Sequence, residues 1–167
     1  MQSQPLSSVI GTIAGVISSD RFPTGERAAL RRMTPRQPPP LAFYRFALSH
    51  LPDGWDHSKE SQKNWMTLMA GISIMSPNAH DPKSSLGRVL AEKNYSEARL
   101  ERLLSDSAVG DVRRILVLRV ARFLGSKSSP FNWVHAARLL LTQDDEKLMA
   151  VREQIAKDYY GSKRETE

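Results

Sequence analysis

Apolar residues recur at intervals of three and four along most of the chain, which is the spacing of one face of an α-helix. No segment of any length alternates apolar and polar residues, as a half-buried strand would. Prolines and glycines interrupt the helical pattern, and serines precede several of its stretches, as N-caps do. The pattern predicts an all-α protein of about eight or nine helices. Helices are expected near residues 6–18, 24–33, 41–51, 58–75, 85–93, 96–105, 109–125, 131–142 and 144–160.

Residues 76–85 form the best candidate boundary between domains. They contain two prolines and few residues that a core could bury. A chain of 167 residues is long enough for one ordinary domain or two small ones. We therefore expect two small helical bundles, one from residues 1–80 and one from residues 81–167.

Two predictions about burial can be tested directly against a structure. The helix at 41–51 is expected to turn one side to the core, and Trp55, in an Asp-Gly-Trp turn, is the one tryptophan whose position allows exposure. Trp65 and Trp133 fit helical core positions better than base-stacking platforms. The side of the 41–51 helix predicted to be buried carries Leu41, Tyr44, Ala47, Leu48 and Leu51.

Positive charge is concentrated in two blocks. The net charge is +6, and residues 21–45 hold six arginines against one acid, a balance of +5. Residues 83–138 hold eleven lysines and arginines against five acids, a balance of +6, whereas residues 139–167 hold five against seven, a balance of −2. Clusters of this kind favour a polyanionic partner, although solvated helix faces that only add solubility are an alternative.

The helix at 24–33 has the spacing of a phosphate-binding element. Arg27 and Arg31 lie four residues apart, hence on one face, and Arg32 flanks them. Thr24 is a plausible N-cap, and Glu26 in the first turn suits the helix dipole. The three arginines suit successive phosphates of a nucleic-acid backbone better than any catalytic chemistry.

The helix at 109–125 is amphipathic, with a polar face made mostly of arginine. Arg114, Arg119 and Arg122 gather on this face, and no acid follows Asp111 that could pair with them at i±4. Arg113 falls near the apolar edge, where it would be buried or in an interface. On the preceding helix Arg99 and Arg102 interleave with Glu97 and Glu101, so structural salt bridges are as good an explanation there as nucleic-acid binding.

Enzymatic motifs are almost entirely missing. There is no cysteine, no phosphate-binding glycine loop and no Gly-x-Ser-x-Gly. His80-Asp81 matches a metal phosphohydrolase dipeptide, but it lies in a proline-bounded loop without further ligands on helices. His135 is more typical of a packed or surface histidine than of a base. We expect no catalytic residue, no metal, no cofactor and, without an apolar run of membrane-spanning length, a cytoplasmic protein with no membrane partner.

Several stretches in a fixed order along the chain carry a resemblance to a known family. They are residues 25–32, Pro35, Phe43-Tyr44, residues 85–90, residues 96–104, the arginine-rich helix, Asn132-Trp133 and Lys157-Asp158-Tyr159-Tyr160. In order and spacing, which cover nearly the whole chain, they resemble the CasB family, the small subunit of the type I-E CRISPR surveillance complex, Cascade. One departure is that Ile155-Ala156 precede the closing motif, where family members often have a tryptophan.

The resemblance implies a non-catalytic, all-α protein of two helical bundles. Such proteins assemble as two copies beside the subunits that hold the guide RNA, line a basic path for the displaced strand of the target DNA, and stabilise the R-loop. Arg27 matches the family's signature arginine, and the arginines of 113–122 match its basic C-terminal helix, whereas Lys127 and Arg138 rest mainly on the charge pattern. The nucleic-acid-binding residues expected are Arg27, Arg31, Arg32, Arg99, Arg113, Arg114, Arg119, Arg122, Lys127 and Arg138.

Two other classes of function stay open. One is a free-standing nucleic-acid-binding regulator, which would need a helix-turn-helix; the prolines and polar runs at 34–40 and 125–130 fit that motif poorly. The other is a structural subunit whose arginines dock on acidic groups of a neighbouring protein. An enzyme is the least supported class.

Overall fold

The computed structural model describes residues 4–165, and within them the chain forms nine α-helices and no strand, which confirms the predicted all-α class. Most predicted helices are present within a few residues of their expected bounds. The helices are α1 (Leu6–Ser18), α2 (Thr24–Arg31), α3 (Leu41–His50), α4 (Lys59–Met75), α5 (Leu86–Glu92), α6 (Glu97–Leu104), α7 (Asp111–Ser126), α8 (Trp133–Leu141) and α9 (Asp145–Glu165).

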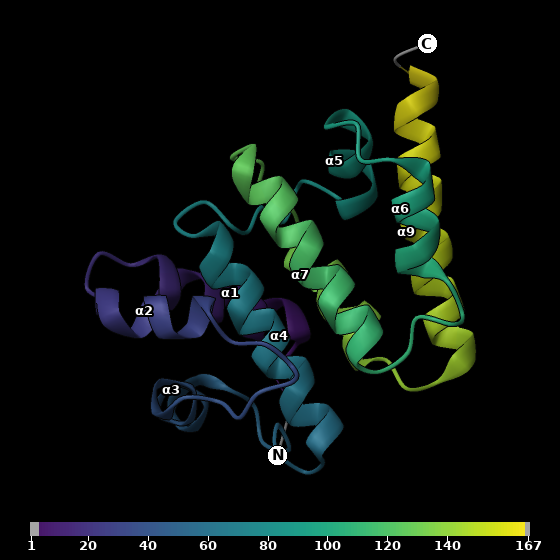
Figure 1. The fold of residues 1–167 in the computed structure, drawn as a ribbon. Helices are drawn as coiled ribbons and strands as arrows, with labels where there is room; N and C mark the ends of the chain where they lie inside the picture. The colour runs from purple at the N-terminus through teal and green to yellow at the C-terminus, as the bar shows by residue number, and fades with distance from the viewer. Residues whose placement is uncertain (1–3, 166–167) are drawn as a thin grey trace.

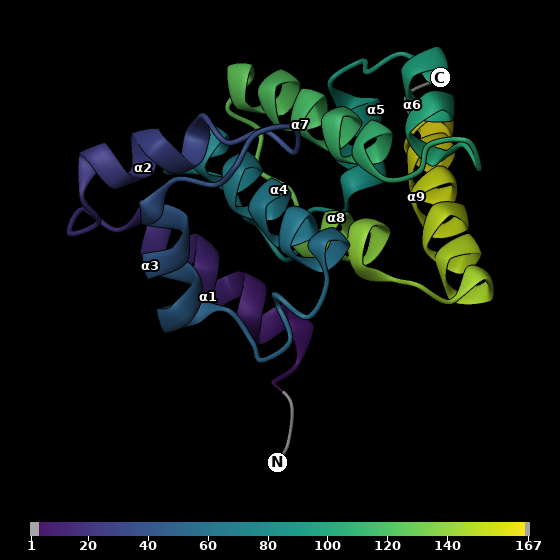
Figure 2. The same cartoon turned by 60° about the horizontal axis from the view of Figure 1, so that its bottom comes forward.

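Helix α4 lies at the centre of the fold (Figures 1 and 2). It packs against α7, α2 and α8, and almost every residue of its last three turns is buried. Ser58 caps its N-terminus by accepting the N–H of Ser61, as the sequence predicted for this helix. Gly71 lies against the Trp133 ring of α8: a Cβ there would be 2.3 Å from the ring, so only glycine lets the two helices approach this closely.

The C-terminal part is held together by close contact between α5 and α9. A Cβ on Gly87 of α5 would lie 2.2 Å from the backbone oxygen of Ile155 on α9, so this glycine also marks a backbone approach. Tyr159 of α9 is fully buried beside it and reaches the junction of α5 and α6. In the view of Figure 1, α6 is drawn in front of the long α9.

Two histidines join the start of α8 to the loop before α5. The backbone N–H of Trp133 donates to Nδ1 of His80, 3.1 Å away. The N–H of Leu86 donates to Nδ1 of His135, 3.2 Å away. Each imidazole therefore satisfies a donor at a helix N-terminus that has no partner within its own helix. Burial lowers the pKa of both histidines, which favours the neutral form that accepts these bonds.

Three local predictions differ from the structure. Of the side of α3 predicted to be buried, Ala47 is buried, but Leu41 and Leu48 are 78% and 79% exposed, because the helix turns Phe43 and Phe46 to the core. Trp55 is only 8% exposed, since its ring packs edge-on against Phe43. The eighth helix begins at Trp133 behind an Asn132 cap, two residues after its predicted start.

Buried side chains from both predicted bundles form one cluster, and α4 contributes to it along with α7 and α8. The division of the chain at residue 80 stays a prediction. Among residues 4–165 no helix is both long and apolar enough to cross a bilayer. Within the same range no three His, Cys, Asp or Glu side chains are placed to share a metal ion.

Candidate nucleic-acid interface

The predicted arginines fall into two structural groups, those whose guanidinium makes two or more hydrogen bonds within the protein and those whose side chain is exposed with at most one such bond. Arg27 belongs to the first. Its Nε donates to the carbonyl of Ile17 and its Nη2 to that of Ser19, both at 2.9 Å, while the group lies over the Phe22 ring. Arg27 thus caps the C-terminal end of α1, where unpaired carbonyls and the helix dipole attract a cation.

Arg113 is buried and has the same kind of role on α6. Its Nη2 donates to the carbonyl of Ser105 at 2.7 Å, and its Nε donates to that of Leu103 at 3.4 Å. Burial lowers its pKa, and so does the nearby charge of Arg152. The sequence had placed Arg113 at an apolar edge, and its burial confirms this.

Arg114 is 3% exposed and occupies the centre of a polar network between α7 and α4. It forms ion pairs with Asp111 and Glu60, and its Nε donates to Oδ1 of Asn64 at 2.8 Å. Lys63 lies 3.4 Å from the same Asp111 carboxylate. The guanidinium of Arg114 is therefore bound within the protein, mainly to α4, although the helical pattern had placed Arg114 on the open polar face.

The arginines at the end of α2 are exposed. Arg31 extends across α4, where its Nη2 donates to the carbonyl of Ser73 at 3.3 Å. Arg32 is the C-cap residue of α2 and borders a shallow cavity of about 200 Å³ with the proline-rich loop. Neither forms an ion pair with a residue in the described range 4–165.

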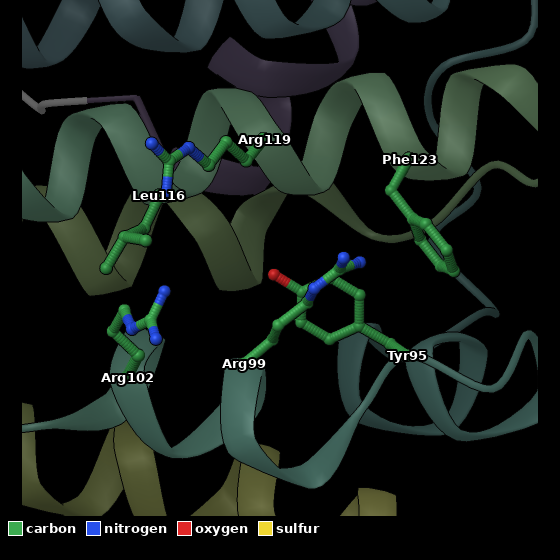
Figure 3. Close-up of a pocket in the computed structure, with 6 residues that line it drawn as sticks. All are labelled: Tyr95, Arg99, Arg102, Leu116, Arg119 and Phe123. Atoms are coloured by element: carbon green, nitrogen blue, oxygen red, sulfur yellow. The ribbon is translucent and has the colours of Figure 1, made fainter.

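The most developed site is a cavity of about 370 Å³ between α6 and α7, which we call the α6–α7 pocket. Arg99 and Arg102 extend from one turn of α6, and Arg119 faces them from α7 (Figure 3). All three are exposed, and none forms an ion pair with any acid among residues 4–165. The apolar and aromatic lining is contributed by Tyr95, Leu116 and Phe123.

Tyr95 forms part of this lining because the chain turns sharply before it. Asn94 adopts a left-handed conformation, φ 61°, and ends α5, and Ser96 caps the next helix. Tyr95 is held between them, with its N–H bonded to the Leu90 carbonyl at 2.9 Å. Burial raises the pKa of its phenol, and the charges of Arg99, Arg119 and Arg102 offset part of that rise.

The acids that the sequence interleaves with Arg99 and Arg102 do not pair with them. Glu97 instead accepts a hydrogen bond from the Tyr160 hydroxyl on α9, and this carboxylate raises the pKa of that phenol to about 12. Arg99 lies over the Tyr95 ring, 5.9 Å from its centroid. Arg102 was missing from the predicted binding set, although the same salt-bridge alternative applied to Arg99, which was included. Its position three residues after Arg99 is the signal that could have added it.

The remaining predicted residues are also exposed. Arg122 follows Arg119 by one turn on α7, and Lys127 lies over the Phe123 ring, 5.4 Å from its centroid, at the end of the same helix. Arg138 is on α8 and does not line the α6–α7 pocket. The basic surface therefore has a continuous part along α6 and α7 and separate members on α2 and α8.

Comparisons with known proteins agree with the sequence resemblance. A family model described as CRISPR-associated protein Cse2 matches residues 26–160. One chain in the crystal structure of E. coli Cascade bound to a PAM-containing dsDNA target has a similar fold, with a TM-score of 0.67 and 21% sequence identity. The similarity covers 93% of this chain and 96% of that chain. A search of curated proteins found no match.

Proposed function

Because this chain belongs to the Cse2 family, the CasB family that its sequence resembles, we propose that it is a non-catalytic small subunit of a CRISPR RNA-guided surveillance complex. Its open arginines hold the displaced DNA strand of the R-loop in this proposal. Family membership supports the assignment to the complex. The observation that supports strand binding is the α6–α7 pocket, where three guanidinium groups converge and no acid of the described chain neutralises them.

The physical chemistry of R-loop formation suits such a subunit. The guide–target hybrid is about as stable as the DNA duplex that it replaces, so protein contacts to the backbone can decide the balance. A displaced strand presents phosphates whose counterions are released when arginines bind them. Base pairing with the guide already supplies sequence recognition, so contacts that ignore sequence are sufficient.

The structure also suggests how the predicted residues divide between support and binding. Arg27, Arg113 and Arg114 hold the ends of α1, α6 and α4, so we leave them out of the proposed surface, and their expected nucleic-acid contacts stay predictions. The partners in this proposal are the other Cascade subunits, a second copy of the chain, the guide RNA and the target DNA. The proposed binding surface consists of Arg31, Arg32, Arg99, Arg102, Arg119, Arg122, Lys127 and Arg138.

The test measures R-loop lifetime on a matched target, using complexes assembled with the chain, without it, and with an Arg99→Gln/Arg102→Gln/Arg119→Gln variant. A control variant removes the same number of charges from exposed positions on α9, as Lys147→Gln/Lys157→Gln/Arg164→Gln. Omission and the pocket variant should both shorten the lifetime, whereas the α9 control should behave as wild type. The pocket variant should also lower the salt dependence of strand retention by a slope of about 2.

Two results would contradict the proposal. If the chain does not co-purify with the complex, its assignment as a subunit is wrong. If omission shortens the lifetime but the pocket variant does not, the chain is a scaffold and its arginines serve another contact.

A further inference from the structure

We infer that the α6–α7 pocket receives one nucleotide of the single strand, with its phosphate between the arginines and its base inside the cavity. The inference rests on the proposed function but goes beyond backbone binding, because it gives this subunit a contact with a base. A base has an apolar, aromatic face, and the pocket offers a lining of the same character behind its charged rim.

The arrangement of the charged groups defines where the phosphate would lie. Arg99 and Arg102 belong to α6 and Arg119 to α7, so the guanidinium groups approach the opening from opposite sides (Figure 3). Three like charges without acidic partners repel one another, and an anion placed between them would relieve that repulsion. The planar fork of each guanidinium also matches the geometry of phosphate oxygens.

The interior of the pocket is larger than a phosphate requires. The cavity of about 370 Å³ lies within the range of small-molecule sites. Leu116 contributes an aliphatic surface, and Phe123 is half-buried with its ring 5.1 Å from that of Tyr95. A phosphate alone would leave the half-buried Phe123 ring in contact with water, whereas a base stacked on that ring would cover it.

The Tyr95 hydroxyl is an independent sign of a ligand. Tyr95 is 3% exposed, yet its hydroxyl has no hydrogen-bond partner among the described residues. Among the described residues, Trp133 Nε1 is the one side-chain nitrogen or oxygen that is both sealed from solvent and unpaired. The Tyr95 oxygen is unpaired, so it cannot be sealed from solvent, and it reaches the cavity. Figure 3 shows it pointing into the space between the arginines. A buried phenol normally has a partner, and a base edge or phosphate oxygen would supply one.

The first experiment compares binding of the full chain to two fluorescent oligonucleotides of equal length, oligo(dT) and an abasic strand with the same phosphates. Wild type should bind oligo(dT) about fivefold or more tightly, the effect expected of one stacked base. Phe123→Leu, which keeps apolar volume, should remove this preference, and Tyr95→Phe should reduce it. Arg119→Gln should weaken binding to both strands alike. Tyr44→Leu, which removes a partly exposed aromatic ring on α3, is the matched control and should change nothing.

The second experiment uses the assembled complex and a target whose displaced strand carries 5-iododeoxyuridine. Photo-cross-linking followed by mass spectrometry should identify Phe123 or Tyr95, and Arg119→Glu should abolish that cross-link. Thermal melting of each variant establishes that it is folded.

Three results would overturn the inference. Equal affinity of wild type for both strands, together with no cross-link in the pocket, would mean that the protein binds the backbone alone. The proposed function would then still be tested separately by the R-loop experiment. If Tyr44→Leu loses the preference for oligo(dT) over the abasic strand and Phe123→Leu keeps it, the base binds at another surface. Binding of poly-glutamate that depends on Arg119 and excludes DNA would make the pocket a protein-docking site.

Discussion

The hydroxyl of Tyr159 on α9 donates a hydrogen bond to the backbone carbonyl of Tyr95, 2.5 Å away in the buried junction between α5 and α6. The closing Lys-Asp-Tyr-Tyr stretch of the chain thus supports the residue that lines the α6–α7 pocket. The bond joins two segments 64 residues apart in sequence, and it holds the backbone of Tyr95 while leaving its own hydroxyl free to face the cavity.

Replacing Tyr159 by Phe should lower the free energy of unfolding by about 1–3 kcal/mol, because the Tyr95 carbonyl would lose its partner in a buried position. Denaturant unfolding measures this. The adjacent Tyr160→Phe is the control, since its bond to Glu97 lies at the surface and its removal should cost no more than about 0.5 kcal/mol. Equal losses for the two variants would show that the Tyr159 bond does not stabilise the junction.

Gly87→Ala should force α5 away from α9. The new Cβ would meet the Ile155 oxygen at 2.2 Å and the Asp158 Cβ at 2.8 Å, and backbone cannot move aside as a flexible side chain can. We expect a loss of about 1–3 kcal/mol, measured by thermal or denaturant unfolding. Gly161→Ala on α9 has open space around it and should stabilise the helix by up to about 1 kcal/mol. If Gly87→Ala leaves the free energy of unfolding unchanged, α5 and α9 pack less closely than the structure shows.

Arg114→Gln and Arg119→Gln should have opposite phenotypes. Arg114→Gln removes the centre of a network with Asp111, Glu60 and Asn64 and should lower the free energy of unfolding by about 1–3 kcal/mol. The expected loss is moderate because Asp111 and Glu60 are partly exposed to solvent. Arg119→Gln should change stability by no more than about 0.5 kcal/mol but weaken single-strand binding. Unfolding curves and anisotropy titrations on the same samples measure both effects; a stable Arg114→Gln that binds DNA poorly would reverse the two roles.

Stability should fall as the pH drops below about 6.5. Burial lowers the pKa of His80 and His135 in the folded chain. Between the folded and unfolded pKa values the unfolded chain therefore binds more protons than the folded chain. In that interval the free energy of unfolding rises with pH. The contribution of the neutral imidazoles is complete above the unfolded value and is lost as the pH falls through the folded values. Urea unfolding from pH 8 to pH 5 measures this slope.

The double variant His80→Asn/His135→Asn tests the source of that slope. An Asn side-chain oxygen can accept the N–H bonds now made to Nδ1 but does not titrate in this range. The variant should therefore show a flatter dependence on pH than wild type. An unchanged slope would assign the pH sensitivity to other groups.

Much of the fold could be predicted because its elements depend on local chemistry. Ser58 and Ser96 accept N–H groups of the first turns of α4 and α6, as serine N-caps do. The prolines that follow α2 and α4 cannot continue a helix, whereas Pro5, Pro23 and Pro40 precede helices, where proline is tolerated. The side of α3 that faces the core was predicted wrongly because both of its faces carry apolar residues, and only the neighbouring Phe22, Trp55 and α2 decide which one is covered.

The candidate site was predicted in part. Arg99 and Arg119 were expected from the charge pattern and the family resemblance, and both line the pocket. Arg102 was missed although neither acid of α6 is spaced to pair with it, since Glu97 and Glu101 lie five and one residues before it. In the fold Glu97 accepts a hydrogen bond from Tyr160 of α9 instead. The contribution of Tyr95 could not be read from a pattern, since it depends on the turn at Asn94 and on a bond from Tyr159.

By itself the sequence determined the helical class, the approximate bounds of the helices, the two basic blocks and the family, because helix periodicity, capping and composition are properties of neighbouring residues. The tertiary structure alone decided which arginines are available. Arg113 and Arg119 lie on the same helix six residues apart, yet one binds the carbonyls at the end of α6 and the other is open, because α6 covers only one of them. Burial and the competition for acidic partners depend on segments distant in sequence, and these two quantities distinguish an arginine that supports the fold from one that can bind a strand.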